Sequence, residues 1–479
     1  MQHPWIILWY LYLAAQLFLV SFLFHPFILL LIYAGTRLLG LRPRPTPFRA
    51  IRKQYQFGIV ITAHRETDLI PPIIDSLLKQ THRRFNVYVV ADDCDIRHLH
   101  FRDTRIHLLK PPTALNDQMA SLNYGLQHLT DQDEVLVIFD PDNLVHPDFL
   151  HTLNAFYNSG CSAVCGRMRS KNSQAAYEQI DSMGASLSNF IERDMRSLLG
   201  LSSNISGSGI SVHKHLYRTI EYDERSKTGG FDKQLQLGIV KNIRRIAYAR
   251  DAVFYDEKVG DGQNFERQRI RWIAAHFKFL GNAFDLLWTG LRRRDGNLIY
   301  FAYNLVRPPY FILLTLSCFM MITDWFIDPR LSFAWLAGLA AFTLSFLLIV
   351  TKDITHRSLT RMILYIPRIF YRQLRALARL KLNKRSLLKT SHTRIVYIDD
   401  ILSPSPTSSA ATIHPSPTSS AQTAPRPAAA AATRPPFTAS SSAPPPAPAS
   451  TKQNPRSGYA SSPHPPATDK TQDYGRSRS

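Results

Sequence analysis

Paired carboxylates follow two short apolar runs in this sequence. The first run ends in "ADDCD", which contains Asp92 and Asp93, and the second ends in "FDPDN", which contains Asp140 and Asp142. Acidic side chains at the ends of buried strands are costly unless positive charge lies beside them. A divalent cation takes oxygen ligands and would bring a diphosphate with it. The two pairs therefore predict a metal and diphosphate site, although aspartate-rich turns are a simpler explanation of either pair alone.

The second half of the region carries two further candidate segments. Asp232 lies in "GGFDKQLQL", where a loop gives way to an apolar-periodic segment, so it is either a functional carboxylate or a helix cap. In "FERQRIRW", a helix over 264–280 would place Gln268, Arg271 and Trp272 on one face. Arginine can neutralise a phosphate, and tryptophan offers a flat surface for a sugar ring. The same composition also fits a helix at a membrane surface.

Two weaker signals accompany these segments. Gly207 and Gly209 in "NISGSGI" would let the backbone approach a ligand, or form a simple turn. Cys161 and Cys165 show no zinc-type double pair, and the four cysteines form no recognisable disulfide framework. The cysteine pattern therefore favours a reduced, cytosolic setting for the polar part of the chain.

Alternating strand and helix patterns surround the carboxylates. The runs 57–63, 86–92 and 134–140 are short and rich in valine and isoleucine, as in parallel strands buried on both faces. Segments 67–81 and 115–129 between them have helical periodicity. This alternation predicts an α/β fold with a parallel, doubly wound sheet. The ligand of such a sheet lies at the carboxyl ends of the strands.

Long apolar segments flank this α/β region. Segment 5–35 has no Asp, Glu, Lys or Arg and is long enough to cross a bilayer, once or with a fold back at His25-Pro26. Two further spans are expected near 309–327 and 331–350. The basic residues that give the chain its formal charge of +21 lie largely beside these segments. The positive-inside rule then places residues 37–300 in the cytoplasm, and a nucleic-acid partner is not expected.

These patterns divide the chain into five expected parts. They are an N-terminal transmembrane anchor of one or two spans, a cytosolic catalytic domain, two transmembrane helices, a basic amphipathic interfacial segment and a disordered Pro/Ala/Ser-rich tail. Their expected boundaries are, in that order, 1–36, 50–290, 299–352, 355–402 and 403–479.

Taken in order, the motifs resemble a membrane-bound family 2 glycosyltransferase of the cellulose and hyaluronan synthase type. The resemblance covers roughly residues 55–290 and the flanking spans. The family has an aspartate after an early strand, a D-x-D, a catalytic aspartate and Q-x-x-R-W. The matching residues are Asp92 or Asp93, Asp140 with Asp142, Asp232, and the segment Gln268-Arg269-Ile270-Arg271-Trp272.

The resemblance implies a nucleotide-sugar-binding domain of the GT-A type, which is Rossmann-like, flanked by transmembrane helices. The implied metal is Mg²⁺ or Mn²⁺ on Asp140 and Asp142, and the implied general base is Asp232. The remaining residues would bind the donor or the acceptor: Asp92, Asp93, Asp140 and Arg271 the nucleotide sugar, and Gln268 and Trp272 the acceptor.

The sequence departs from the family pattern at two positions. The acidic residue that usually precedes the catalytic aspartate is Phe231 here, and Lys233 follows it. The charge of Lys233 would weaken a neighbouring carboxylate as a base. A lysine common in the helix after the second strand is replaced by Gln118.

The predicted activity is that of an inverting hexosyltransferase at the cytoplasmic face of the cell membrane. The enzyme would move sugar from a UDP-linked donor to a growing glycan or polysaccharide, with membrane lipid and possible export subunits as partners. Transfer of one sugar to a lipid-linked or short glycan acceptor is the alternative, followed by a catalytically inactive membrane scaffold. A haloacid-dehalogenase-type phosphatase fits "VLVIFDPDN" loosely but leaves Q-R-I-R-W unexplained.

Overall fold

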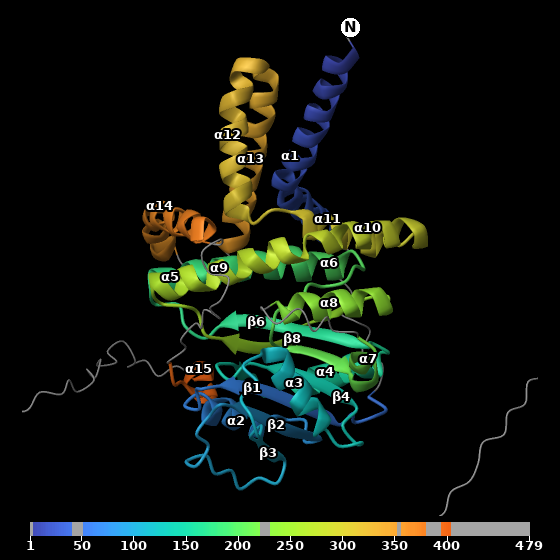
Figure 1. Cartoon of the computed structure of the whole chain (residues 1–479), viewed down its shortest axis with the longest axis vertical. Helices are drawn as coiled ribbons and strands as arrows, with labels where there is room; N and C mark the ends of the chain where they lie inside the picture. The colour runs from blue at the N-terminus through green and yellow to red at the C-terminus, as the bar shows by residue number, and fades with distance from the viewer. Residues whose placement is uncertain (1–2, 41–50, 221–229, 352–355, 380–393, 404–479) are drawn as a thin grey trace, which may run out of the picture. The chain divides into compact units, whose positions relative to one another are not determined.

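The computed structural model describes residues 3–40, 51–220, 230–351, 356–379 and 394–403, so residues 404–479 of the predicted tail lie outside the described part. A mixed sheet with strand order β3-β2-β1-β4-β7-β6-β8-β5 lies at the centre of the domain that follows residue 51 (Figure 1). Its strands are β1 Phe57–His64, β2 Phe85–Asp92, β3 Ile106–Leu109, β4 Val135–Phe139, β5 Leu144–Val145, β6 Ala163–Ser170, β7 Ile210–His213 and β8 Ala247–Asp256.

The three strands predicted from apolar runs are adjacent and parallel. Strand β1 pairs with β2 on one side and β4 on the other, with His64 opposite Asp92 and Ile61 opposite Phe139. Their carboxyl ends therefore lie at one edge of the sheet. The residue that follows β4 is Asp140, so both predicted carboxylate pairs lie at that edge.

The prediction of a parallel sheet is correct only for part of it. Strand β7 pairs antiparallel with both β4 and β6, and β5 pairs antiparallel with β8. Strand β7 has four residues and β5 has two, too few to show the periodicity by which strands are recognised in a sequence.

Both faces of the sheet are covered by helices, and alternate strand residues point to each. On β1, Phe57, Ile59 and Ile61 pack against one cluster, while Val60 packs against the other. The first cluster includes residues of α2 and α4, and the second includes residues of α3, α7 and α8. The helices are α2 Ile70–Leu78, α3 Gln118–Gln127, α4 Phe149–Asn158, α7 Lys214–Arg218 and α8 Phe231–Asn242.

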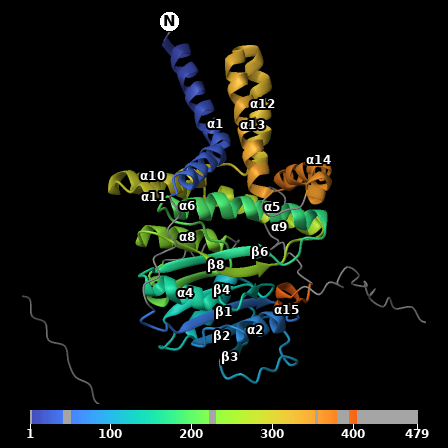
Figure 2. The ribbon, with the colours of Figure 1, turned by 180° about the vertical axis from the view of Figure 1, so that it is seen from behind.

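A band of helices lies between the sheet and three long apolar helices (Figures 1 and 2). Helices α9 and α14 pack against each other within this band, as do α10 and α11. The band consists of α5 Ala176–Ser188, the π-helix η1 Asn189–Asp194, α6 Met195–Leu198, α9 Gly262–Phe279, α10 Gly281–Arg293, α11 Gly296–Val306 and α14 His356–Arg379.

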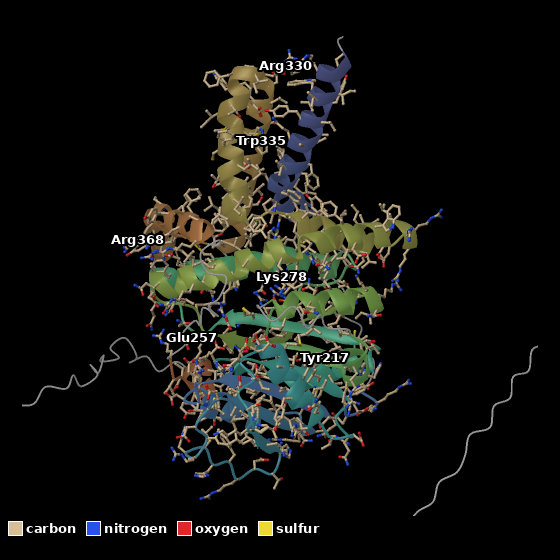
Figure 3. The ribbon with its side chains drawn as sticks, in the orientation of Figure 1. Tyr217, Glu257, Lys278, Arg330, Trp335 and Arg368 are labelled. Carbon is tan, nitrogen blue, oxygen red and sulfur yellow. The ribbon has the colours of Figure 1, made fainter. Side chains whose placement is uncertain are left out.

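Three described helices are long and apolar enough to cross a membrane: α1 His3–Leu38, α12 Tyr310–Ile327 and α13 Pro329–Val350. Helix α1 continues through Pro26 without folding back. Helix α13 packs against both α1 and α12. Figure 3 shows Trp335 of α13 within this bundle and Arg330 at the end that lies away from the sheet.

A polar network ties the three apolar helices together. The carboxylate of Asp324 is fully buried and accepts hydrogen bonds from Gln16 Nε2 and Trp335 Nε1, each at 2.9 Å, and from the hydroxyl of Tyr12. Trp335 Nε1 also donates to Gln16 Oε1 at 2.8 Å. A charged group buried among apolar helices is stable only with such partners.

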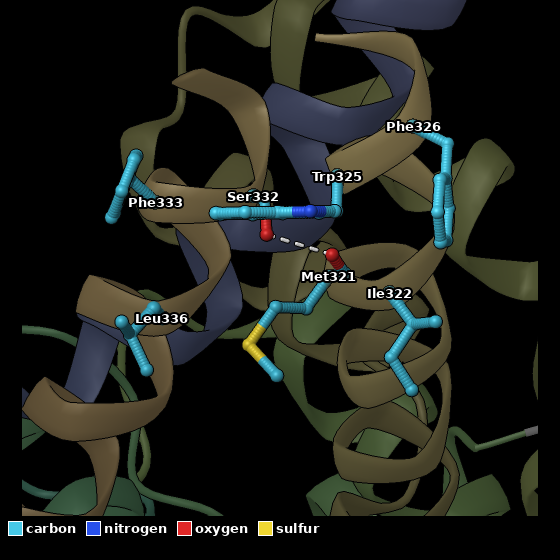
Figure 4. A pocket seen from close by; sticks show the side chains of 7 residues that line it. All are labelled: Met321, Ile322, Trp325, Phe326, Ser332, Phe333 and Leu336. Carbon is cyan, nitrogen blue, oxygen red and sulfur yellow. Dashed lines mark hydrogen bonds between the residues drawn. The ribbon is translucent and has the colours of Figure 1, made fainter. Parts of the chain in front are cut away.

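An apolar hollow lies near the turn between α12 and α13 (Figure 4). Its one polar contact in view is the bond from Ser332 Oγ to the carbonyl oxygen of Met321, at 2.7 Å. The hollow is lined by Met321, Ile322, Trp325, Phe326, Ser332, Phe333 and Leu336. It contains none of the predicted site residues, and its lining is largely apolar.

The short helix α15 Ile398–Leu402 packs on the sheet-containing domain beside α2. Ile398 is fully buried in a cluster with Leu144 and Tyr255. Lys79 Nζ lies 2.6 Å from the carboxylate of Asp399. Residues 394–402, although predicted as part of an interfacial segment, therefore contact the domain that holds the strand ends.

Candidate active site

Asp92, at the end of β2, organises the loop that leads into α3. It is 1% exposed, and its carboxylate accepts hydrogen bonds from the backbone N–H groups of Leu115 at 2.7 Å and Asn116 at 2.9 Å. His64 Nδ1 lies 2.9 Å from the same carboxylate. Both oxygens of Asp92 are therefore engaged by protein groups, which fits a positioning role.

Asp93, the next residue, faces solvent. Its backbone has a φ of 52°, in the left-handed region, and this turn directs the side chain away from the strand. Arg65 Nε lies 2.7 Å from its carboxylate, and this hydrogen bond lowers the pKa of Asp93. Of the two candidates for nucleotide contact, Asp93 is the accessible one.

Asp140 lies between α3 and the loop before β7. Its Oδ1 accepts a hydrogen bond from Gln118 Nε2 at 3.0 Å, and its Oδ2 accepts one from Ser208 Oγ at 2.5 Å. Gln118 is the residue that replaces the lysine common in the family, so the substituted side chain reaches the first carboxylate of the D-x-D. Ser208 carried no sequence signal except its place between two glycines.

Asp142 is buried, at 6% exposure, so it does not extend into solvent beyond the strand end. Asn143 Nδ2 lies 3.3 Å from Asp142 Oδ1 and 3.1 Å from Asp256 Oδ1, which joins the D-x-D to the end of β8. Lys258 Nζ donates to Asp256 at 2.9 Å. Burial disfavours the charged form of Lys258, but Asp256 and Asp181 outweigh it and raise its pKa.

A second lysine approaches the same group of carboxylates. Lys171 Nζ lies 3.4 Å from the carbonyl oxygen of Asp142 and 3.6 Å from Glu257. Burial lowers its pKa, and the charges of Glu257 and Asp142 oppose this shift. Residues 255–259, "YDEKV", therefore lie near Asp142: Asp256 shares Asn143 with it, and Glu257 shares Lys171 with it.

The glycine-rich loop connects Asp140 to the start of α8. A Cβ atom at Gly207 would lie 3.6 Å from Phe231 Cε1 and 3.9 Å from Asp140 Oδ2. Gln236 of α8 fixes the loop: its Oε1 accepts from the backbone N–H of Ile205 at 2.8 Å. Its Nε2 donates to Asn204 Oδ1 at 2.6 Å. The loop therefore brings the first turn of α8 close to the strand ends.

Asp232 lies in that first turn. The N-cap residue of α8 is Gly230, with a φ of 84°, so Asp232 is not the helix cap that its local sequence suggested. Asp232 is half-buried. The first turn of a helix also presents free backbone N–H groups, which favour anions.

Helix α9 carries the Q-R-I-R-W segment and closes the site from the other side. A Cβ atom at Gly230 would lie 3.3 Å from Ala275 Cβ, so α9 contacts the start of α8. The protein packed around Arg271 lowers its pKa, whereas the charge of Asp140 raises it. Arg271 therefore lies within electrostatic range of Asp140.

The three residues expected to share one face of α9 differ in burial. Trp272 is 48% exposed, and Arg271 is also exposed. Gln268 is 9% exposed, and its Oε1 has no hydrogen-bond partner within the described part of the chain. Arg269, which was not predicted as a site residue, stacks on the Trp272 ring at 4.2 Å and reaches Asp181 at 2.5 Å. The i, i+3 spacing of Arg269 and Trp272 was the sequence feature that could have indicated this contact.

The carboxylates fit a divalent cation that also takes substrate ligands. Within the described residues, no group of three or more His, Cys, Asp or Glu side chains is arranged to hold a metal alone. Mg²⁺ is commonly held by one or two carboxylates together with substrate phosphates and water. The pair Asp140 and Asp142, with anion-favouring N–H groups and Arg271 nearby, suits that kind of site.

Comparison with known proteins gives one family match. The model described as "Glycosyltransferase like family 2" matches residues 55–275, which run from the start of β1 into α9. A search of curated proteins finds no match.

Solved structures that are similar to the chain include the following two, which have low sequence identity to it. Mannosyltransferase PcManGT from Pyrobaculum calidifontis, in complex with GDP-Man and Mn²⁺, is 14% identical with a TM-score of 0.47, covering 78% of this chain and 99% of that one. S. aureus TarS 1–349 is 13% identical with a TM-score of 0.36, covering 69% and 92%.

Proposed function

We propose that the chain, whose residues 55–275 match the family 2 glycosyltransferase model, is an inverting glycosyltransferase that works at the cytoplasmic face of a membrane. Its donor is a nucleotide sugar, which we take to be UDP-linked, and its product is a growing glycan or polysaccharide. One observation carries this proposal: Asp140, Arg271 and the first turn of α8 converge at the carboxyl ends of parallel strands.

The donor site is built on the strand ends. Asp93 contacts the nucleotide, while Asp92 holds the loop before α3 in place. Asp140 and Asp142 would hold Mg²⁺ or Mn²⁺, which would supply positive charge to neutralise the diphosphate. Arg271 supplies further positive charge to the departing nucleoside diphosphate.

The transfer step requires a base on the opposite side of the donor sugar. Asp232 takes the proton from an acceptor hydroxyl as the hydroxyl oxygen attacks the anomeric carbon. The bond from that carbon to the diphosphate breaks in the same displacement, so the configuration inverts. The exposed ring of Trp272 stacks with the acceptor sugar, and Gln268 contributes to acceptor binding.

The apolar helices support a multi-pass membrane location. Helices α1, α12 and α13 meet the length and composition of spans, and the basic flanks favour a cytoplasmic catalytic domain. In the described part of the chain, two candidate spans follow the domain, a small number for a complete export channel. This favours either partner subunits for export or the second candidate function, transfer of one sugar to a lipid-linked or short glycan acceptor.

The proposal is tested by nucleotide release from a panel of sugar nucleotides. Detergent-purified full-length protein is assayed with Mg²⁺ or Mn²⁺ and with EDTA. Metal-dependent release from one donor is the expected result and identifies the sugar. Folded protein that releases nucleotide from none of the donors, with membrane extract added to supply acceptor and partners, would overturn the proposed activity.

A further inference from the structure

Helix α10 exposes an apolar stripe along one side. Phe284, Trp288 and Leu291 are 65%, 57% and 54% exposed, and Phe277 at the end of α9 is 49% exposed. Their spacing of seven, four and three residues places them on one face of the α9–α10 run. We call these four residues the α10 stripe. Large apolar side chains grouped in this way usually mark an interaction surface.

A different face of α10 packs against the protein. Leu286 and Gly290 are buried, and a Cβ atom at Gly290 would lie 2.9 Å from Ile299 of α11. The carboxylate of Asp285 lies 2.5 Å from Lys241 Nζ at the end of α8. In the described part of the chain, the ring contacts of the stripe are with neighbours on the same run: His276 with Phe277 and Arg292 with Trp288.

Basic residues border the stripe. Arg292, Arg293 and Arg294 end the helix and are exposed, and the guanidinium of Arg292 lies 4.6 Å from the centre of the Trp288 ring. Apolar side chains beside tryptophan and arginine are typical of a helix that lies in the headgroup region of an anionic bilayer. One nitrogen of the Arg293 guanidinium already has a partner in the protein, because Nη1 donates to the carbonyl oxygen of Lys241 at 3.2 Å.

The position of α10 agrees with this composition. It lies in the helix band on the side of the candidate spans, on a level with α14 (Figures 1 and 2). Helix α14 also exposes apolar side chains, with Ile366 at 55% and Tyr371 at 62%. We propose that the α10 stripe lies in the surface of an anionic bilayer. This inference rests on the proposed membrane insertion of α1, α12 and α13.

Membrane contact of α10 would bear on the active site. The pair of Asp285 with Lys241 and the bond from Arg293 to the Lys241 backbone join α10 to the end of α8. Helix α8 carries Asp232 in its first turn. The bilayer surface therefore helps to set the position of the helix that holds the proposed base.

The first experiment locates the stripe by photo-crosslinking. The full chain is reconstituted in nanodiscs of phosphatidylcholine and phosphatidylglycerol, with p-benzoylphenylalanine replacing Trp288 or, as a control on the polar flank, Thr289. We expect lipid adducts by mass spectrometry at position 288 and far fewer at 289. Crosslinks from 288 to protein, or equal adducts at both positions, would overturn the proposal.

The second experiment tests whether the arginines beside the stripe attract anionic lipid. In mixed nanodiscs, adducts at 288 are expected to be enriched in phosphatidylglycerol, by a factor of about five per arginine at the surface. The double change Arg292→Gln with Arg294→Gln should reduce the enrichment, whereas Arg102→Gln, at an exposed position on the catalytic domain, should leave it unchanged. Enrichment that the double change does not alter contradicts the role of these arginines. A carbonate wash that releases the chain from membranes would instead show that the proposed spans are not inserted.

Discussion

At the scale of single residues, the site depends on how four aspartates are divided between structure and chemistry. Asp92 is occupied by backbone N–H groups, and Asp93 is open to solvent. Asp140 is held by an amide and a hydroxyl, and Asp142 lies inside a network of buried lysines and acids. The two members of each pair therefore have different environments and should respond differently to substitution.

The first prediction concerns the proposed metal ligands. Asp142→Asn removes a carboxylate charge next to Asn143 and Lys171, and we expect metal-dependent nucleotide release to fall by roughly a hundred-fold or more. Steady-state release across a Mn²⁺ titration measures this loss. Asp148→Asn, at an exposed position after the same strand, is the matched control and should retain activity. Unchanged release in the Asp142 variant would remove it from the metal site.

The second prediction concerns the proposed base. Asp232→Asn should lower transfer by about two to four orders of magnitude, because the acceptor hydroxyl loses its proton acceptor. Nucleotide affinity, measured by calorimetry in the same protein, should stay near that of the unaltered enzyme. Transfer at the original rate would mean that another group takes the proton.

At the scale of elements, the loop before β7 has to pass through a narrow space. Gly209 has a φ of 67°, and a Cβ atom there would lie 2.2 Å from Phe254 Cε1. The backbone N–H of Gly209 donates to the carbonyl oxygen of Ile138 at 2.9 Å. This close approach fixes Ser208 where its hydroxyl can hold Asp140.

The third prediction tests that close packing. Gly209→Ala should lower the free energy of unfolding by more than about 3 kcal/mol, because the new methyl group overlaps a buried ring and the backbone is left-handed. Gly160→Ala is the control: its φ is 88°, but no atom lies within 4 Å of the added Cβ. Its cost should be only about 1 kcal/mol of backbone strain. Thermal unfolding in detergent compares the two, and equal losses would contradict the steric explanation.

A buried ion pair links the same loop to the helix band. Glu192 of η1 accepts from Asn204 Nδ2 at 2.8 Å and from Arg307 Nη2 at 2.7 Å. Burial opposes ionisation of Glu192, but Arg307 and the neighbouring Arg196 and Arg193 lower its pKa to about 2. The glycine-rich loop is therefore connected through Glu192 to Arg307, which lies three residues before the start of α12.

At the scale of the whole molecule, the catalytic domain and the apolar helices form parts of one contact network. Helix α13 packs on α5, and a buried cluster includes Leu29 of α1 with Ile191 of η1. The three apolar helices are themselves held by the Asp324 network. Such polar contacts between apolar helices set which faces meet.

The fourth prediction concerns this assembly. Asp324→Ala removes the acceptor that Gln16, Trp335 and Tyr12 share. Trp335 Nε1 keeps its bond to Gln16 Oε1, whereas the buried Gln16 Nε2 loses its acceptor, at a cost of about 1–3 kcal/mol. We expect earlier thermal aggregation of the nanodisc-embedded protein. Thr323→Ala, at a half-buried neighbour whose hydroxyl donates to carbonyl oxygens of its own helix, should have little effect. Equal stability of the two variants would contradict the role of the network.

The sequence alone determined the fold class and the order of the motifs. An α/β domain flanked by apolar helices was predicted and is confirmed, and its residues 55–275 match the family 2 glycosyltransferase model. Long apolar runs, D-x-D and Q-x-x-R-W are local patterns, so they can be recognised in the sequence without knowledge of the fold. The three parallel strands were found because each is a continuous run of buried residues.

Only the tertiary structure decided what depends on contacts between distant segments. The antiparallel strands β5 and β7 are too short to show a period, and their pairing comes from neighbours far away in the chain. The same is true of Gln118 and Ser208 at Asp140, and of Lys258 beside the carboxylate network at Asp142. The N-cap of α8 is Gly230 because of its left-handed backbone, a property that the composition near Asp232 did not reveal. Side-chain roles in this site follow from burial and from hydrogen bonds between segments, and those exist only once the chain has folded.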